Sequence, residues 1–157
     1  REVLSIYLHE RLPFAPELLE EHGEPECARV AMVESTLAYL WKKSPKTEFL
    51  KVAFRNGNNE TLYWKDLVSG ALLKSVVDRA KDIAIRRAVA EPSVDHGISE
   101  ADMHEAVDAE YAENEIFPKS DDVTDWLKLL DFEPESIVNV KPIRPDHGEA
   151  YMRTRVI

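Results

Sequence analysis

Apolar residues recur at helical spacing along four stretches of the chain. These stretches are residues 1–10, 24–42, 69–90 and 99–114. In each of them apolar positions three or four apart fall on one face of an α-helix, so we predict four helices. The longest has the broadest apolar face, which consists of Leu72, Leu73, Val76, Val77, Ala80, Ile83 and Ala84.

Capping residues mark where several of these helices begin. Ser69 precedes the longest helix, and we interpret it as an N-cap rather than as a nucleophile, because it has neither a nucleophile-elbow motif nor an identifiable base. Ser99 and Asp102 have the spacing of a capping box. A further short helix is predicted over residues 121–130, where two aspartates at the start suit the positive end of a helix dipole.

Alternation of apolar and polar residues predicts strands in two regions. Residues 48–55 and 60–64 alternate on either side of Asn56-Gly57, a pair that tolerates the positive φ of a tight turn, so we predict a β-hairpin at about residues 48–65. Residues 137–143 alternate in the same way. That late strand can pair with an edge of the hairpin or with a neighbouring subunit. The fold class predicted is α+β.

The charge balance narrows the classes of partner. Thirty acidic residues against 20 basic ones give a net charge of −10, which would repel a phosphate backbone, so we expect no nucleic-acid partner. No stretch is apolar enough to span a bilayer, so we expect no membrane partner. Cys27 has no cysteine to pair with, which favours a reducing, cytoplasmic setting and a buried thiol. Because the chain begins with Arg1 instead of methionine, we interpret it as a fragment.

Known catalytic and binding motifs are absent from the sequence. Its glycines, at positions 23, 57, 70, 97 and 148, spell neither a phosphate-binding loop nor a dinucleotide fingerprint. No His-x-x-x-His pair is present to hold a metal. His104 with its neighbouring carboxylates is interpreted as a solvated acidic face, and so are Glu110, Glu113 and Glu115. We therefore expect no catalytic residue and no metal ligand in this chain.

One segment has a sequence that points to a family. Residues 64–86 include Ser-Gly-Ala at 69–71 and the run Val-Asp-Arg-Ala-Lys at 77–81. This segment resembles the Ser-Gly-Ala helix in the small C-terminal lid of AAA ATPases. In the same order along the chain, residues 3–8, 49–64, 108–118 and 121–126 are similar to other parts of that lid. The chain is identified as a member of the family of AAA ATPases forming ring-shaped complexes, to which mycobacterial proteasome-associated ATPases belong.

The resemblance implies a fold and a role. A helical lid with an inserted hairpin would occupy residues 1–118, and residues 119–157 would form an extension with a short helix and a strand. The parent would be a cytoplasmic homo-hexamer that unfolds proteins with ATP and magnesium, and the fragment alone would bind neither. Gly70, Ala71 and Tyr7 would lie beside the adenine. The lid's partners would be the preceding large domain, neighbouring subunits, and possible 20S proteasome or protein substrates.

Two departures and two other interpretations accompany this resemblance. The family's ATP-hydrolysing motifs would lie upstream of Arg1. The proteasome-docking tail of the family does not match residues 153–157, which read Arg-Thr-Arg-Val-Ile. One alternative is a nucleotide-independent interaction module that pairs an exposed strand edge with a partner's strand. The other is a small enzyme built around His104.

Overall fold

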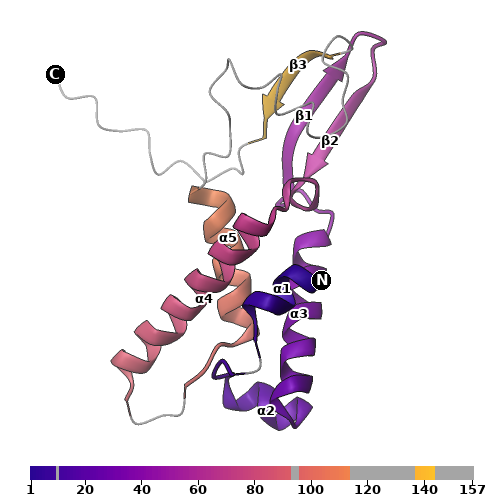
Figure 1. The fold of residues 1–157 in the computed structure, drawn as a ribbon. Helices are drawn as coiled ribbons and strands as arrows, with labels where there is room; N and C mark the ends of the chain where they lie inside the picture. The colour runs from indigo at the N-terminus through magenta and orange to yellow at the C-terminus, as the bar shows by residue number, and fades with distance from the viewer. Residues whose placement is uncertain (10, 93–95, 114–136, 144–157) are drawn as a thin grey trace, which may run out of the picture.

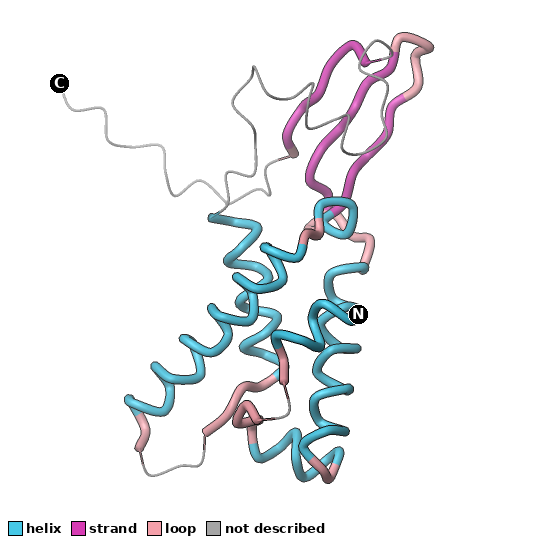
Figure 2. The backbone as a smooth tube through the Cα atoms, viewed as in Figure 1, coloured by secondary structure: helices cyan, strands magenta, loops and turns pink. Residues whose placement is uncertain are grey.

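The computed structural model describes residues 1–9, 11–92, 96–113 and 137–143, which form a helical bundle with a small sheet projecting from one end (Figures 1 and 2). The helices are α1 (Glu2–Tyr7), α2 (Pro16–His22), α3 (Pro25–Trp41), α4 (Gly70–Ala90) and α5 (Glu100–Glu113). The strands are β1 (Glu48–Phe54), β2 (Asn59–Tyr63) and β3 (Ile137–Pro142), and a short 3-10 helix, η1 (Trp64–Leu67), follows β2. The predicted α+β class is confirmed.

Both predicted caps are present. The hydroxyl of Ser69 accepts a hydrogen bond from the Leu72 amide over 3.2 Å at the start of α4. At the start of α5, the Ser99 amide donates to Asp102 over 2.8 Å, and the Asp102 amide donates back to the Ser99 hydroxyl over 3.2 Å. Amides that have no partner inside the helix are thereby satisfied, which fixes where α4 and α5 begin.

Helix α2 was not predicted from the sequence. Pro16 occupies its first turn, Leu18 is buried, and Gly23 ends it with a φ of 78°, a conformation that glycine adopts without strain. The loop before α2 runs beside the loop before α5, where the Ala15 amide donates to the Ile98 carbonyl over 3.0 Å. The two backbones come so close that a Cβ on Gly97 would lie 2.2 Å from the carbonyl carbon of Phe14. Only glycine fits at that crossing.

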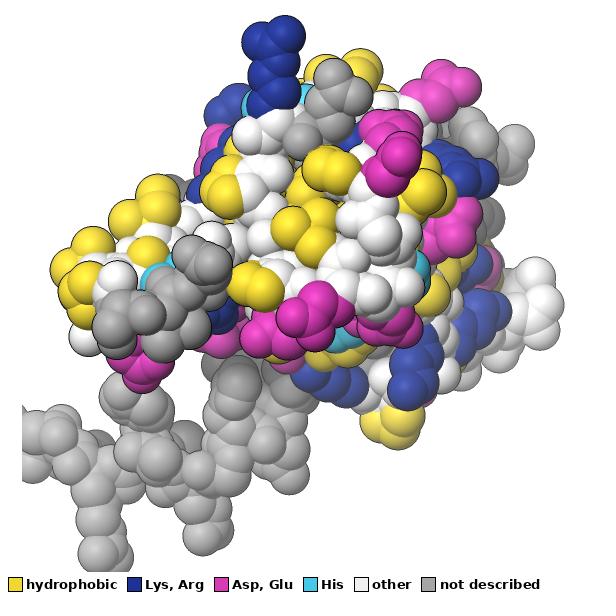
Figure 3. All heavy atoms as spheres, turned by 90° about the horizontal axis from the view of Figure 1, so that it is seen from below, with side chains coloured by type: hydrophobic (Ala, Val, Ile, Leu, Met, Phe, Trp, Pro, Cys, Tyr) yellow, Lys and Arg dark blue, Asp and Glu magenta, His cyan; other side chains and the backbone are white. Residues whose placement is uncertain are grey.

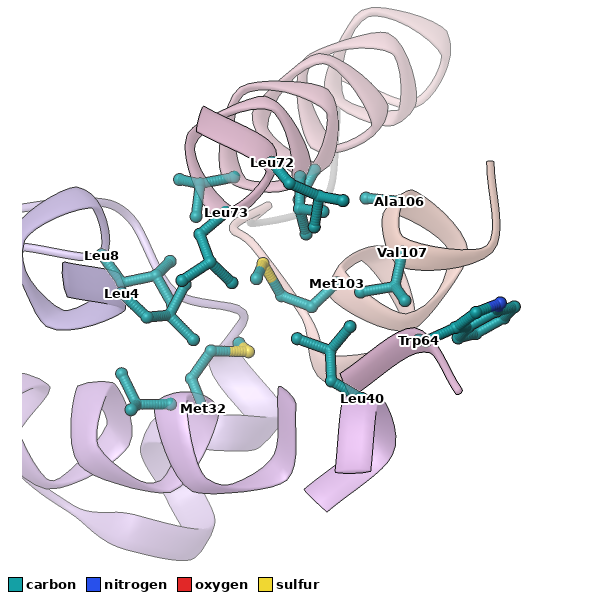
Figure 4. Close-up of a cluster of buried hydrophobic side chains, with 14 of the residues drawn as sticks. Leu4, Leu8, Met32, Leu40, Trp64, Leu72, Leu73, Met103, Ala106 and Val107 are labelled. Atoms are coloured by element: carbon teal, nitrogen blue, oxygen red, sulfur yellow. The ribbon is translucent and has the colours of Figure 1, made fainter. Parts of the chain in front are cut away.

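The core lies where α1, α3, α4 and α5 meet. Leu4, Met32, Leu73 and Met103, one from each helix, point into the same interior (Figure 4). Leu4, Met32 and Met103 are fully buried. Full burial of a side chain of this size contributes about 1.5–3 kcal/mol, so this contact is a main source of the bundle's stability.

The sheet is antiparallel with the strand order β2-β1-β3. Leu50 and Val52 of β1 and Leu62 of β2 are buried, as their alternation predicted, and Gly57 takes a positive φ of 84° in the hairpin turn. Strand β3 pairs with β1, so the first of its two predicted pairings is confirmed. The hairpin ends at Tyr63, two residues before the predicted limit of about residue 65, because Trp64 begins η1.

Aromatic side chains join the sheet to the helices. Tyr111 of α5 stacks on Trp64 with ring centroids 4.5 Å apart and planes 5° apart, and its hydroxyl donates to the Trp64 carbonyl over 2.9 Å. Phe49 meets the Tyr111 ring edge-on. Burial raises the pKa of the Tyr111 phenol above its ordinary value, which keeps the hydroxyl protonated as a donor.

Several sequence-based predictions have other outcomes. The Cys27 thiol is exposed, so the prediction of a buried thiol is wrong; residue 27 is on the first turn of α3, outside the face that packs on the core. The helix over 121–130, Glu115 and the 118/119 domain boundary lie outside the described residues. None of the helices in the described part of the chain has the length and hydrophobicity needed to cross a membrane.

Candidate functional site

Helix α1 packs against the start of α4, where two of the three predicted adenine-contact residues lie. A Cβ added to Gly70 would lie 3.7 Å from Cγ1 of Val3, an ordinary contact distance. Gly70 and Ala71 are exposed in the described structure, and Val3 is 42% exposed beside them. The first turn of α4 therefore presents a nearly bare backbone to its surroundings, which a flat ligand can approach closely.

Tyr7 lies on the same side of the fold. It is half-buried at the end of α1 and packs against the edge of the core. The pKa of the Lys74 ammonium is raised mainly by its hydrogen bond to Asp78, and the Tyr7 phenol makes a smaller electrostatic contribution. Lys74 is one helical turn beyond Gly70. Gly70 and Ala71 thus lie on the first turn of α4, and Tyr7 lies at the end of the adjacent α1; that they contact adenine stays a prediction.

The start of α4 is electrically positive. Its first turn contains no acidic residue, so the helix dipole is not offset there. Lys74 donates to Asp78 over 2.7 Å, and Lys81 donates to the other carboxylate oxygen over 3.2 Å. These two hydrogen bonds lower the pKa of Asp78. Lys74 and Lys81 therefore share the charge of Asp78, and the positive end of the helix dipole is the remaining contribution at Gly70.

The carboxylates near His104 do not form one site with it. The His104 ring stacks on Tyr39 with centroids 4.1 Å apart, and its Nε2 lies 3.3 Å from the Ser35 hydroxyl. Asp108 instead accepts hydrogen bonds from Tyr39 over 2.8 Å and from Lys46 over 2.6 Å. Asp108 thus has its own structural partners, which gives no support to an enzyme built around His104.

Asp102 is also held by other groups. It accepts two hydrogen bonds from Arg87, at 2.5 and 2.7 Å, in addition to those of its capping box. Burial alone would raise the pKa of Asp102, but the hydrogen bonds from Arg87 and Ser99 and the Arg87 charge outweigh it and hold that pKa below its ordinary value. This contact ties the end of α4 to the start of α5.

An apolar surface at the other end of α4 was not recognised in the sequence. Ile85 is 59% exposed and Val89 is 74% exposed, one turn apart. Beside Ile85 a groove of about 250 Å³ is lined by Leu12, Ala84, Ala88 and Ile98 among others. Seen from below, exposed hydrophobic side chains gather in groups among charged ones (Figure 3). The sequence did contain a signal for this surface, because Ile85 and Val89 are apolar and yet fall outside the predicted core face of the helix.

Comparison with known proteins identifies the family. The model of the ARC AAA+ ATPase lid domain matches residues 1–156. The chain belongs to this lid-domain family. It is 36% identical over 130 residues to the AAA ATPase forming ring-shaped complexes of Corynebacterium kroppenstedtii, covering 82% of this chain and 23% of that protein. It is 34% identical over 149 residues to the proteasome-associated ATPase of Geodermatophilus obscurus. That match covers 94% of this chain and 25% of that protein. The chain thus spans about a quarter of the length of these relatives.

The charged residues in the run 77–81, which suggested this lid family, have structural roles within the lid. Arg79 donates to both oxygens of Glu113, at 3.1 and 2.7 Å, and its Nε lies 3.4 Å from Glu110. This links α4 to the end of α5 and places two of the three glutamates that were interpreted as an acidic face, Glu110 and Glu113, around one guanidinium. Among the described residues, no three His, Cys, Asp or Glu side chains are grouped to hold a metal.

The Asp102–Arg87 contact predicts how lid stability depends on pH. Because the folded-state pKa of Asp102 is lowered, its stabilisation is fully present above the unfolded pKa of about 3.9 and is lost as the pH falls through the folded pKa. We expect Asp102→Asn to lower the free energy of unfolding by about 1–2 kcal/mol at neutral pH, since capping and charged hydrogen bonds are lost.

Urea unfolding of the original protein and of Asp102→Asn, between about pH 7 and pH 3, measures the difference between their free energies of unfolding. It should shrink toward the acidic end, where the carboxylate of the original protein becomes protonated. Asp82→Asn is the matched control, because Asp82 is exposed on α4, and it should leave the unfolding curve nearly unchanged. A difference that stays constant across this pH range would contradict the assignment.

Proposed function

We propose that this chain is the lid of a longer ATPase that assembles as a cytoplasmic homo-hexamer and unfolds proteins. The family match over residues 1–156 is the observation that carries this proposal. In it, ATP and magnesium are held by the large domain of the parent protein, and the isolated lid binds ATP very weakly and hydrolyses none. The relative from Geodermatophilus obscurus is named a proteasome-associated ATPase, and in this proposal the parent of this chain takes a proteasome as a partner as well.

The proposed adenine contact is made by Gly70, Ala71 and Tyr7. The exposed backbone of the first turn lets a planar base approach, and an aromatic ring on the adjacent helix offers a second apolar surface. The positive start of α4 and Lys74 would favour an anionic nucleotide. In this proposal magnesium is held with the phosphates by the large domain of the parent protein.

A second part of the proposal is contact between subunits. Ile85 and Val89 lie about 22 Å and about 28 Å along α4 from Gly70, given a rise of about 1.5 Å per residue. Large apolar side chains exposed beside an apolar groove are typical of protein interfaces. One helix would therefore reach the nucleotide at its start and a neighbouring subunit near its end, and its tilt would carry motion from one to the other.

The adenine contact is tested by filling the space that glycine leaves. Gly70→Trp in the parent ATPase should raise the Kd for ATP about tenfold, which corresponds to about 1.4 kcal/mol, because the indole occupies the position proposed for the base. Gly70 is exposed and has no positive φ, so the variant should fold. Nucleotide titration, with hexamer formation checked by light scattering, gives the readout.

The matched control is Ala101→Trp, which adds the same ring at an exposed position on α5. It should leave ATP affinity unchanged. If Gly70→Trp bound ATP as tightly as the original protein, the adenine assignment would be wrong and the interaction-module alternative would gain. In that alternative the partner's strand would pair with the outer edge of β2 or of β3, because β3 already occupies the other edge of β1.

The subunit contact is tested by placing a charge on the apolar surface. Val89→Lys in the parent protein should shift hexamers toward smaller assemblies, because a buried ammonium would have to lose its hydration. Lysine suits the last turn of a helix, so the lid itself should remain folded. Val138→Lys, at another exposed valine (65% exposed) on β3, serves as the control. Particle size is measured by light scattering. Equal particle sizes for the two variants would contradict a subunit contact at this surface.

A further inference from the structure

A second groove lies where the base of the sheet meets α5. It encloses about 350 Å³, enough for one or two large side chains. Its floor is formed by Phe49, Trp64 and Tyr111, each less than 10% exposed. The stacked rings of Trp64 and Tyr111 and the edge of Phe49 hold this floor rigid. A preformed aromatic floor favours an apolar side chain as the occupant.

The rim of this groove is acidic. Glu48 and Glu105 line it, together with the Lys46–Asp108 ion pair, in which the ammonium and the carboxylate lie 2.6 Å apart. Three carboxylates against one ammonium leave two negative charges in excess. An occupant with basic residues beside its apolar side chains would match both the floor and the rim.

The chain itself contains a segment of this composition. Residues 151–157 read Tyr-Met-Arg-Thr-Arg-Val-Ile, with two arginines, no acidic side chain and apolar residues on both sides of them. Strand β3 ends beside the groove, because the Ile143 amide donates to the carbonyl of Phe49 over 2.8 Å. The eight residues from Ile143 to Tyr151 can span up to about 26 Å, which is ample for a return to the groove.

We propose that the groove between β1, η1 and α5 is a peptide-binding site whose occupant is the chain's own basic segment, residues 151–157. Tyr151 or another apolar side chain would rest on the aromatic floor, and Arg153 and Arg155 would meet Glu48 and Glu105. This site is separate from Gly70, Ala71 and Tyr7 and does not depend on a bound nucleotide.

The test measures binding of a fluorescent peptide of residues 151–157 by anisotropy. A chain ending at Ala150, which keeps every described residue, should bind the peptide, while the full chain should bind it about tenfold more weakly because its own segment competes. Circular dichroism verifies that the shortened chain is folded. A peptide with glutamates in place of both arginines should not bind.

Variants of the shortened chain show whether the peptide uses this groove. Glu105→Lys should weaken binding about tenfold, and Ala112→Trp should abolish it by filling the groove from an exposed position. Glu60→Lys makes the same charge change at an exposed residue of β2, away from the groove, and should have no effect.

Three outcomes would overturn the proposal. The first is no binding to the shortened chain. The second is equal loss of binding in Glu105→Lys and Glu60→Lys, which would indicate attraction to overall charge. The third is a full chain that dimerises through residues 151–157, which would assign the groove to a second copy of the chain. None of these outcomes bears on ATP affinity, so this test is independent of the lid assignment.

Discussion

The burial of one face of α4 is the constraint on which the rest of the structure depends. Val76, Val77 and Ala80 are fully buried, and α1 and α5 both pack along this helix. Because a helix with one apolar face must cover it, α1 is drawn against the first turns of α4 and α5 against the remainder. The opposite face is left to present Gly70 and Ala71 at its start and Ile85 and Val89 near its end. The positions of both proposed surfaces follow from that packing.

Local patterns in the sequence were enough to predict most elements. Helix α4, its Ser69 cap, the capping box of α5 and the hairpin turn at Gly57 each depend on residues close together in the chain. Contacts between distant residues gave no such pattern. Helix α2 is only seven residues long, too short for two full turns of periodicity, and the need for glycine at 97 arises from a loop more than 80 residues earlier.

The candidate site was predicted by resemblance more than by spacing. Nothing in the order of Tyr7, Gly70 and Ala71 predicts that their helices meet; the packing of α1 on α4 brings the two helices together. The carboxylates around His104 show the reverse case. They are neighbours along α5, yet Asp102 turns to Arg87 and Asp108 to Lys46, so sequence proximity overstated their connection. Exposure also cannot be read from sequence alone, as Cys27, Ile85 and Val89 demonstrate.

The most direct test of the central claim is photolabelling of the assembled parent ATPase with an azido-adenine nucleotide, followed by mass spectrometry of the labelled peptides. The lid assignment predicts label on the segments that contain Tyr7 and Gly70–Lys74, reduced by excess ATP. Label confined to other parts of this chain, such as the sheet, or absent from it while the large domain is labelled, would contradict the placement of this surface beside the adenine.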